Sequence, residues 1–358
     1  MGRLRTILAP LRYKALRGLR FKAREMDQVA AKRWEMSPAV EEDVEPIVLP
    51  EGHLQKIGTG ALGEPPDKVR ADFTATRAVH MPTVAYLLRD VSLAGAFCYC
   101  GRHKIDLYPP GQLPSNSTEA AEFGQLDHCV LAGTYAGARW YGHMLHDDLP
   151  LQMAATSIGQ PILNARRIYS HEPGWRGAFD LLIPTRYHHF FAREMIVISD
   201  FSQNRYKQDR LRAMRQKLAG RPKALHRRVY IRRGAGGTKR VLINEAEVVS
   251  SLERQLGFST FCPDGLSVSE IIDLCNGAEL VVSVEGSHAV PPMYTVADGG
   301  KVIFLFPPNR VTSLMPKVFR TAGVRCATFI GDTYGNGQEE FTVNAEELVR
   351  FVESFAGK

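Results

Sequence analysis

The sequence lacks several features that would mark a specialised class of protein. It has no apolar run near the roughly 18 residues that a membrane span needs. None of its six cysteines are spaced Cys-x-x-Cys, as zinc knuckles and thioredoxin-type sites require. It begins without the apolar segment of a secretory signal and contains no internal repeat. With 44% hydrophobic and 23% charged residues, we expect a globular protein. Its length of 358 residues predicts two domains, and its cysteines fit a reducing cytoplasm.

The chain also has little net positive charge outside one segment. Residues 1–34 hold ten Lys and Arg against two acidic residues, whereas the whole chain has a formal charge of +7, so the rest is nearly neutral. This distribution argues against a nucleic-acid-binding fold, which carries its basic face on the folded body. Leucines recur at helical spacing in the segment, although Pro10 interrupts them. A basic amphipathic segment predicts attachment to an anionic membrane surface; a helix packed on the protein itself or a disordered arm are the alternatives.

The most informative stretch covers residues 229–306, where short β-rich runs alternate with helical runs. This alternation predicts βαβ units on a parallel sheet. Asn244 with Glu247, and Ser267 with Glu270, have the spacing of capping boxes at helix starts. The predicted strands are 229–231, 258–262, 279–284 and 301–306, with helices over 244–256 and 267–275.

Two turns in this stretch follow predicted strands. RRGAGGTKR (232–240) places four cations around three glycines, and EGSH (285–288) offers a tight turn, a hydroxyl and an imidazole. Ligands of parallel sheets bind at the carboxyl ends of strands, and guanidinium groups fork onto phosphate oxygens. Two anion-friendly turns on one sheet edge predict a diphosphate and hence a nucleotide ligand. A solvated basic turn beside an ordinary strand-to-helix turn is the alternative.

A third informative stretch is WYGHMLHDDLP (140–150). His143 and Asp147 are four residues apart, so on a helix they share one face, and His146 lies on an adjacent face. Such a set predicts a general-base pair or two of three metal ligands. A solvated helix start remains the alternative.

Taken together, these stretches resemble glycosyltransferase family 61. HMLHDDLP (143–150) is similar to the family motif His-Trp-Leu-Leu-Asp-x-Leu-Pro, with Met144 in place of Trp. VYIRRG (229–234) and RVLINE (240–245) resemble the family's Tyr-Ile-Ser-Arg-Arg turn and its Arg-x-x-x-Asn-Glu motif, and Gly257-Phe258 matches the Gly-Phe that follows. The resemblance covers roughly residues 130–306.

The sequence departs from the family pattern in the last turn. Glu285 stands where His is usual, and His288 where Gly is usual; Pro291 replaces a common Asn and Leu151 a common Arg. These departures leave the implied fold intact and leave the donor sugar open. The resemblance implies an α/β, GT-B-like architecture in which two Rossmann-like domains with parallel sheets face each other across a cleft. It also implies an inverting reaction that needs no metal held by an Asp-x-Asp triplet, and the sequence contains no such triplet.

The prediction is an inverting, metal-independent glycosyltransferase with no cofactor, acting in bacterial surface-polysaccharide synthesis. It would bind a nucleotide-sugar donor and a glycan or lipid-linked glycan acceptor, but no nucleic acid. Its predicted domains are a basic extension (1–45), an acceptor-side domain (46–222) and a donor-binding domain with a C-terminal helix (223–358).

The predicted base is Asp147, with His143 orienting it or acting in its place and Glu285 as a further possibility. The residues predicted to bind the donor are Arg233, Arg240, Glu285, Gly286, Ser287 and His288. Two alternatives from other classes stay open. One is an inactive sugar-nucleotide-binding scaffold, and the other is a metal hydrolase using His143, His146 and Asp147.

Overall fold

The chain forms two compact units in a computed structural model. The structure describes residues 24–94, 97–101, 103–107, 122–164, 168–234, 239–335 and 340–357. The first unit contains residues 1–40 and 81–210, and the second contains residues 41–80 and 211–358. The boundary between the two units falls between Arg210 and Leu211, inside helix α8 (Arg205–Ala219). The predicted boundaries at 45/46 and 222/223 differ from this division, because a loop-rich early segment joins the second unit and a helix spans the boundary.

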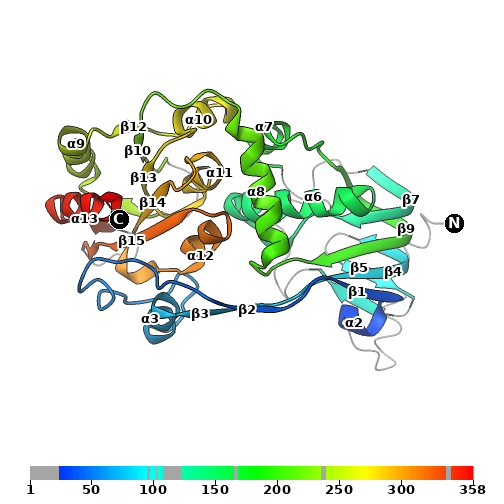
Figure 1. Cartoon of the computed structure of the whole chain (residues 1–358). Helices are drawn as coiled ribbons and strands as arrows, with labels where there is room; N and C mark the ends of the chain where they lie inside the picture. Colours follow the sequence, from blue (N-terminus) through cyan, green and yellow to red (C-terminus); the bar gives the residue numbers. More distant parts are fainter. Residues whose placement is uncertain are drawn as a thin grey trace. The chain divides into compact units, whose positions relative to one another are not determined.

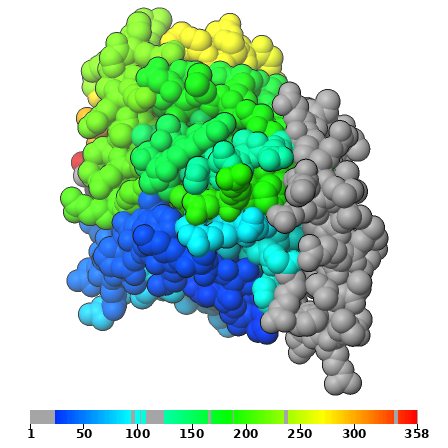
Figure 2. Space-filling view, turned by 90° about the vertical axis from the view of Figure 1, so that its right-hand side faces the viewer, coloured from blue at the N-terminus to red at the C-terminus, as the bar shows by residue number. Residues whose placement is uncertain are grey.

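The first unit is built on a seven-stranded mixed sheet (Figure 1). Its strand order is β6-β5-β4-β9-β7-β8, and β1 pairs with β4. In Figure 2, residues from the β1 region (blue) and from the region of β4 to β6 (cyan) are seen at the surface. The strands are β1 (Lys32–Ser37), β4 (Thr83–Ala94), β5 (Phe97–Cys100), β6 (His103–Asp106), β7 (Glu122–Leu131), β8 (Pro161–Asn164) and β9 (Thr185–Ser199).

The longest strands of this sheet run antiparallel. β4 and β9 stay paired from Val84 opposite Ser199 to Ala94 opposite His189. Pairs of β4 with β1 and β5 are also antiparallel, whereas β7, β8 and β9 pair in parallel. The prediction of a purely parallel sheet is therefore wrong for this unit. Apolar runs such as those in β4 and β9 indicate strands but not their direction, because direction depends on the connections.

Part of the basic segment belongs to this sheet. Strand β1 contains Lys32 and Arg33, and its pairing with β4 makes it part of the first unit's sheet. Residues 1–23, which carry most of the predicted membrane-binding segment, lie outside the described residues. The other elements of this unit are α2 (Met26–Val29), α4 (Tyr135–Arg139), α5 (Tyr141–His143), the π-helix η1 (Met144–Asp148), α6 (Leu149–Ile158) and α7 (Glu172–Ala178), together with the first part of α8.

The second unit contains the predicted parallel sheet. Its five strands lie in the order β12-β10-β13-β14-β15, and all their pairings are parallel. In chain order this is 2-1-3-4-5, the order of flavodoxin-like doubly wound sheets. Every residue of β13 is buried, as expected for a strand covered on both faces. The strands are β10 (Arg228–Ile231), β12 (Ser259–Phe261), β13 (Leu280–Val284), β14 (Lys301–Phe306) and β15 (Arg325–Ile330).

Most helices of this unit lie between these strands in sequence. Ser267 makes the expected capping box with Glu270. Asn244 is the N-cap residue of α9, but its side chain makes no capping bond and instead donates to Glu247 and bonds the backbone of Val343 in both directions. The helices are α9 (Glu245–Leu256), α10 (Val268–Cys275), α11 (Pro292–Thr295), α12 (Leu314–Thr321) and α13 (Ala345–Gly357), with 3₁₀ turns η2 (Ser287–Ala289) and η3 (Pro308–Arg310). A small sheet combines β11 (Val241–Leu242), β16 (Asp332–Thr333) and β17 (Glu340–Thr342).

Residues 41–80 attach to the same unit at the β15 side. Val48 makes a parallel bridge with Ala327, and the buried ring of His53 accepts a hydrogen bond from the Ile330 amide at 3.1 Å. The segment contains β2 (Val40–Asp43), α3 (Pro66–Thr74) and β3 (Arg77–His80). No helix within the described ranges has the length and apolar character to cross a membrane.

Candidate functional site

The first unit brings His143 and Asp147 into contact, as their spacing predicted. His143 Nδ1 lies 2.7 Å from Asp147 Oδ2. A carboxylate only accepts hydrogen bonds, so Nδ1 carries the proton and Nε2 of His143 keeps its lone pair. The His143 side chain is 24% exposed, whereas the Asp147 side chain is 10% exposed. The pair therefore has a carboxylate on the inside and an imidazole that reaches solvent.

The backbone around this pair is a π-turn rather than a regular helix. Pro150 follows at the start of α6 and has no N–H to donate to the carbonyl of His146. Its ring also crowds the preceding turn, so the helix widens over Met144–Asp148. Single π-turns of this kind are frequent at functional sites. Here it buries His146, Asp147 and Asp148 together.

Lys207 is a member of this site that the sequence analysis missed. Its side chain is fully buried, and Nζ donates to Asp147 Oδ1 at 2.5 Å. Lys207, Leu211, Met214 and Leu218 recur at helical spacing on α8, and all four are buried. A lysine on the apolar face of a predicted helix was the signal that could have revealed it.

Helix α8 also contacts Pro150, which directly follows the π-turn in α6. Arg210 donates to both oxygens of Asp200, at 2.8 and 2.7 Å, and to the carbonyl of Pro150 at 2.9 Å. Asn204 at the start of the helix donates to the hydroxyl of Thr83 at 2.8 Å. The orientation of Asp147 is thus set by α8 as well as by its own turn.

The charges around Asp147 determine its ionisation. Burial alone would raise its pKa, but His146, Lys207 and the hydrogen bond from His143 hold the pKa well below its usual range. His146 Nδ1 lies 3.3 Å from Asp147 Oδ1 without hydrogen-bonding alignment, and burial lowers the pKa of His146. Asp147 is thus a fixed anion with both oxygens engaged, and it is a weak base.

The same three side chains have the composition of a metal site. Ligand atoms of His143, His146 and Asp147 lie within 4.8 Å of one another. Two imidazoles and a carboxylate suit a transition metal such as zinc. However, the Lys207 ammonium already bonds one carboxylate oxygen, and a cation there opposes the binding of a second cation.

Asp148 has a structural role beside the pair. Its Oδ1 accepts hydrogen bonds from the backbone amide and the hydroxyl of Thr134, at 2.9 and 2.7 Å. Thr134 in turn caps α4 by accepting from the Gly137 amide. A side chain at Gly137 would collide with the Asp148 carboxylate. Asp148 therefore fixes the segment 134–143 that leads to His143.

In the second unit the predicted donor residues meet at one point of the sheet. Strand order reverses between β10 and β13, so their carboxyl ends form the topological switch point at which doubly wound folds bind ligands. Arg233 follows β10, and Glu285 to His288 follow β13. Arg233 donates to the carbonyl of Glu285 at 3.3 Å. The two predicted turns are therefore brought together.

Arg240 and Glu285 form a buried ion pair at this point. Arg240 Nε lies 3.0 Å from Glu285 Oε2, and both residues are less than 10% exposed. The geometry does not make a hydrogen bond, so both atoms are buried without one among the described residues. Burial lowers the pKa of Arg240 to about 10; Glu285 opposes this shift, while Arg310 and Arg233 add to it.

Arg310 is a third cation that the sequence analysis did not include. It ends η3, just after β14, and its charge also lowers the pKa of Arg233. Its Nε is buried without a hydrogen-bond partner in the described part of the chain. Glu285 therefore pairs with Arg240 and acts on Arg233, while the charge of Arg310 acts on both of these arginines. We call Arg233, Arg240 and Arg310 the arginine cluster.

His288 is held neutral by these neighbours. Burial and the charges of Arg233 and Arg240 lower its pKa to about 3. Arg233 can only donate, so His288 Nδ1, 3.5 Å away, faces it with a lone pair. His288 Nε2 then donates to Ser283 Oγ at 3.1 Å, and Ser283 donates onward to the carbonyl of Ile231 at 2.9 Å.

Gly286 allows the close approach of two arginines. Its backbone has φ 155°, which side-chain-bearing residues rarely adopt, and a Cβ there would collide with Arg233 Nη1 and crowd Arg240. Ser287 follows at the start of η2 and is partly buried. The other predicted donor residues share one cluster, whereas the Ser287 carbonyl accepts a hydrogen bond from the Val290 amide at 3.4 Å.

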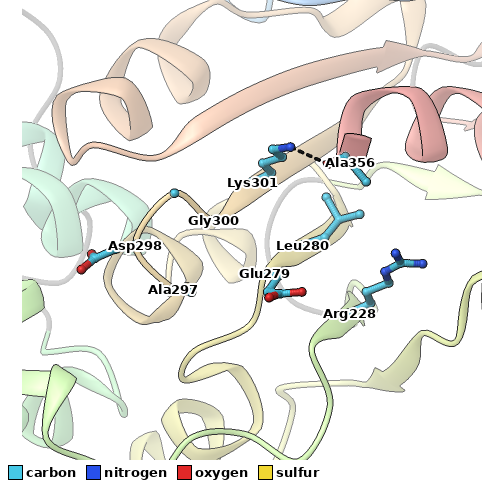
Figure 3. A pocket seen from close by; sticks show the side chains of 9 residues that line it. Arg228, Glu279, Leu280, Ala297, Asp298, Gly300, Lys301 and Ala356 are labelled. Atoms are coloured by element: carbon cyan, nitrogen blue, oxygen red, sulfur yellow. Dashed lines mark hydrogen bonds between the residues drawn. The ribbon is translucent and has the colours of Figure 1, made fainter. Parts of the chain in front are cut away.

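A separate cavity of about 300 Å³ lies at the opposite ends of the same strands (Figure 3). Arg228, Leu280 and Lys301, at the first residues of β10, β13 and β14, line it. Lys301 Nζ donates to the carbonyls of Phe355 and Ala356, as the dashed line in Figure 3 shows for Ala356. This lysine therefore caps the end of α13, and the cavity lies at the edge of the sheet where doubly wound folds do not bind their ligands.

Both sites now define an α/β protein with a basic cluster at the switch point of a parallel sheet. Residues 141–302 match the family model described as Glycosyltransferase 61. The match includes His143 and Asp147 and, of the arginine cluster, Arg233 and Arg240. The predicted family is confirmed: the chain carries a glycosyltransferase family 61 domain, and it is a glycosyltransferase. A comparison with curated proteins gives no match.

Proposed function

We propose that the protein is an inverting, metal-independent glycosyltransferase that uses a nucleotide-sugar donor. The observation that carries this proposal is the arginine cluster at the switch point, where three guanidinium groups act on one another and Glu285 pairs with Arg240. Buried donors without partners are costly, so Nε of Arg240 and of Arg310 favour an incoming anion. A diphosphate supplies several charged oxygens for forked guanidinium contacts.

The cluster also suits the charge that develops in the reaction. When the bond between the anomeric carbon and the diphosphate breaks, negative charge grows on the leaving oxygen. Fixed cations in a desolvated site stabilise that charge without reorganising. His288 supports the cluster by accepting toward Arg233, and its ring nitrogens are already engaged. In this proposal it positions Arg233 and does not itself donate to phosphate.

For the acceptor we propose His143 as the general base, which changes the order of the candidates. Asp147 is a weak base because Lys207 and His143 occupy its oxygens. His143 instead has its Nδ1 proton fixed by Asp147 and its Nε2 lone pair available. The acceptor oxygen would bond to the anomeric carbon, its proton would pass to His143 Nε2, and the nucleoside diphosphate would leave. Glu285 is unsuited to the task because it neutralises Arg240.

The proposed metal independence rests on cations that the chain itself provides. Lys207 holds Asp147 in the first unit, and the arginine cluster supplies positive charge in the second. In this proposal no divalent ion is needed for either task. The observation that supports it is the 2.5 Å contact of Lys207 with Asp147 within the cluster of possible metal ligands.

Several wider expectations stay predictions. They are the GT-B arrangement, the cytoplasmic location, the bacterial surface-polysaccharide pathway and the lipid-linked acceptor. Attachment of residues 1–34 to an anionic membrane also stays a prediction. Since Lys32 and Arg33 belong to β1, its test is a deletion of residues 1–23 followed by sedimentation with anionic vesicles at low and high salt.

The proposed function is tested by incubating the purified protein with a panel of nucleotide sugars and glycan acceptors. Transfer should occur with inversion at the anomeric carbon and should continue in the presence of a chelator. Activity that a chelator removes and that Mg²⁺ or Mn²⁺ restores would contradict the metal-free mechanism. Retention of configuration would contradict the single displacement.

A further inference from the structure

Trp140 differs from the other two tryptophans of the chain. Trp175 is fully buried and Trp34 is partly buried against the first unit's core, whereas Trp140 is 38% exposed. The exposed part of this large ring leaves apolar area in water that a ligand could cover. Trp140 lies immediately before the region that matches the family, and no role is assigned to it by that match.

The surroundings of Trp140 place it beside the proposed base. Its ring centroid lies 5.4 Å from that of His143, at an interplanar angle of 47°. Tyr135 packs edge-on against it at 5.9 Å, and the Arg139 guanidinium lies over the ring at 4.9 Å from the centroid. The indole is therefore fixed on several sides and still exposes surface next to His143.

The backbone keeps this ring in place before any ligand arrives. Trp140 has an extended conformation at the break between α4 and α5. Thr134 caps α4 and donates two hydrogen bonds to the buried Asp148, and these contacts fix the position of the break. A rigid aromatic side chain loses little entropy when it binds a ligand.

We propose that Trp140 is the platform that binds the acceptor sugar ring. The inference rests on the proposed role of His143 as base. One face of a pyranose ring presents C–H groups and its rim presents hydroxyls. Indole surface suits the apolar face, because ligand sites combine aromatic area with a few placed polar groups. A sugar stacked on Trp140 would bring a rim hydroxyl toward the neighbouring imidazole of His143. The ligand class is therefore a pyranose at the accepting end of a glycan.

The test compares Trp140→Ala, Trp140→Phe and the wild-type chain in steady-state transfer. Loss of the stacking surface should raise the acceptor KM by about tenfold to a hundredfold, the usual worth of one aromatic stack. The donor KM should not change, and Trp140→Phe should restore part of the acceptor affinity. Tyr334→Ala, which removes an exposed aromatic ring in the second unit, is the matched control and should behave like the wild type.

Other outcomes would overturn the platform. An unchanged acceptor KM in Trp140→Ala would do so, as would a fall in kcat alone, which would mean that Trp140 only packs against His143. A raised donor KM would assign the ring to the other substrate. If His143→Ala transfers sugar at the wild-type rate, His143 is not the base. To keep the two claims separate, fluorescence titration with methyl pyranosides should show quenching in the wild type and a lost or weaker response in Trp140→Phe. Equal responses would also overturn the platform.

Discussion

The two candidate sites differ in how they treat charge. In the first unit, Asp147 is neutralised by Lys207 and hydrogen-bonded to His143, so the site has one anion and one cation in direct contact. In the second unit, the charges of three arginines act on one another and Glu285 pairs with Arg240. Nε of Arg240 and Nε of Arg310 are buried without a hydrogen bond among the described residues. A balanced site is suited to orienting a neutral proton acceptor, whereas a site with excess positive charge is suited to an anionic ligand.

This difference teaches which residues to assign to chemistry and which to binding. In the first unit Lys207 and Asp147 bond each other, so the group that offers a lone pair at the surface is the imidazole of His143. In the basic site the imidazole of His288 is instead locked neutral between Arg233 and Ser283. Changes in the first unit should therefore affect turnover, and changes in the second should affect donor affinity.

The largest expected effect is that of His143→Ala. Removing the base should lower kcat by about 10²–10⁴-fold, because that is the usual contribution of general-base catalysis. Donor KM should stay within error of the wild type. His128→Ala, at an exposed histidine of the same unit, is the matched control for steady-state kinetics. A full loss of donor affinity in His143→Ala would contradict the assignment of donor binding to the second unit alone.

Next in size is the effect of Lys207→Met on stability. The variant leaves the buried Asp147 carboxylate without its ammonium partner, which typically costs about 3–5 kcal/mol. Chemical denaturation measures it, and Lys217→Met at an exposed position of α8 should lie within about 0.5 kcal/mol of the wild type. If both variants unfold at the same denaturant concentration, Lys207 does not balance Asp147.

A smaller effect is expected for Arg310→Ala in the basic site. Losing one charged donor should weaken binding of a nucleoside diphosphate by about 1–3 kcal/mol. Arg232→Ala, at the exposed neighbour of Arg233, is the control and should bind normally. Calorimetric titration compares the two. Equal affinities would remove Arg310 from the arginine cluster.

The smallest effect concerns the pH dependence that His288 contributes. Its pKa is lowered from 6.5 to about 3, so the folded state keeps the ring neutral while the unfolded chain takes up a proton. This contribution is complete above pH 6.5 and is lost as the pH falls toward 3. The wild type should therefore lose more unfolding free energy than His288→Gln between pH 7 and pH 4.5. Parallel pH profiles from urea titrations would show that His288 is not held neutral.

The sequence predicted the second unit better than the first. Runs such as 279–284 and 301–306 are continuous apolar strands between amphipathic helices, and parallel βαβ units follow from that order almost without alternatives. The long strands β4 and β9 carry a similar apolar pattern, yet they pair antiparallel with each other across about a hundred residues of chain. The local sequence pattern does not show which strands pair or in which direction.

The site residues divide in the same way. His143 and Asp147 could be predicted because a helical spacing of four brings them together, and Arg233 and Glu285 because both follow strands of one parallel sheet. Lys207 and Arg310 reach their sites from distant segments, so only tertiary contacts identify them. Pro150 is visible in the sequence as the last residue of HMLHDDLP (143–150). The consequence, a π-turn that buries Asp147 against Lys207, required the fold.

The most direct test of the account is calorimetric titration of UDP and other nucleoside diphosphates into three proteins. They are the wild type, His143→Ala and Arg240→Ala. The account predicts equal affinity for the first two and an affinity weaker by about 1–3 kcal/mol for Arg240→Ala, since only that variant loses a cation of the basic cluster. Normal binding by Arg240→Ala, or loss of binding in His143→Ala, would contradict the assignment of donor binding to the second unit and of chemistry to the first.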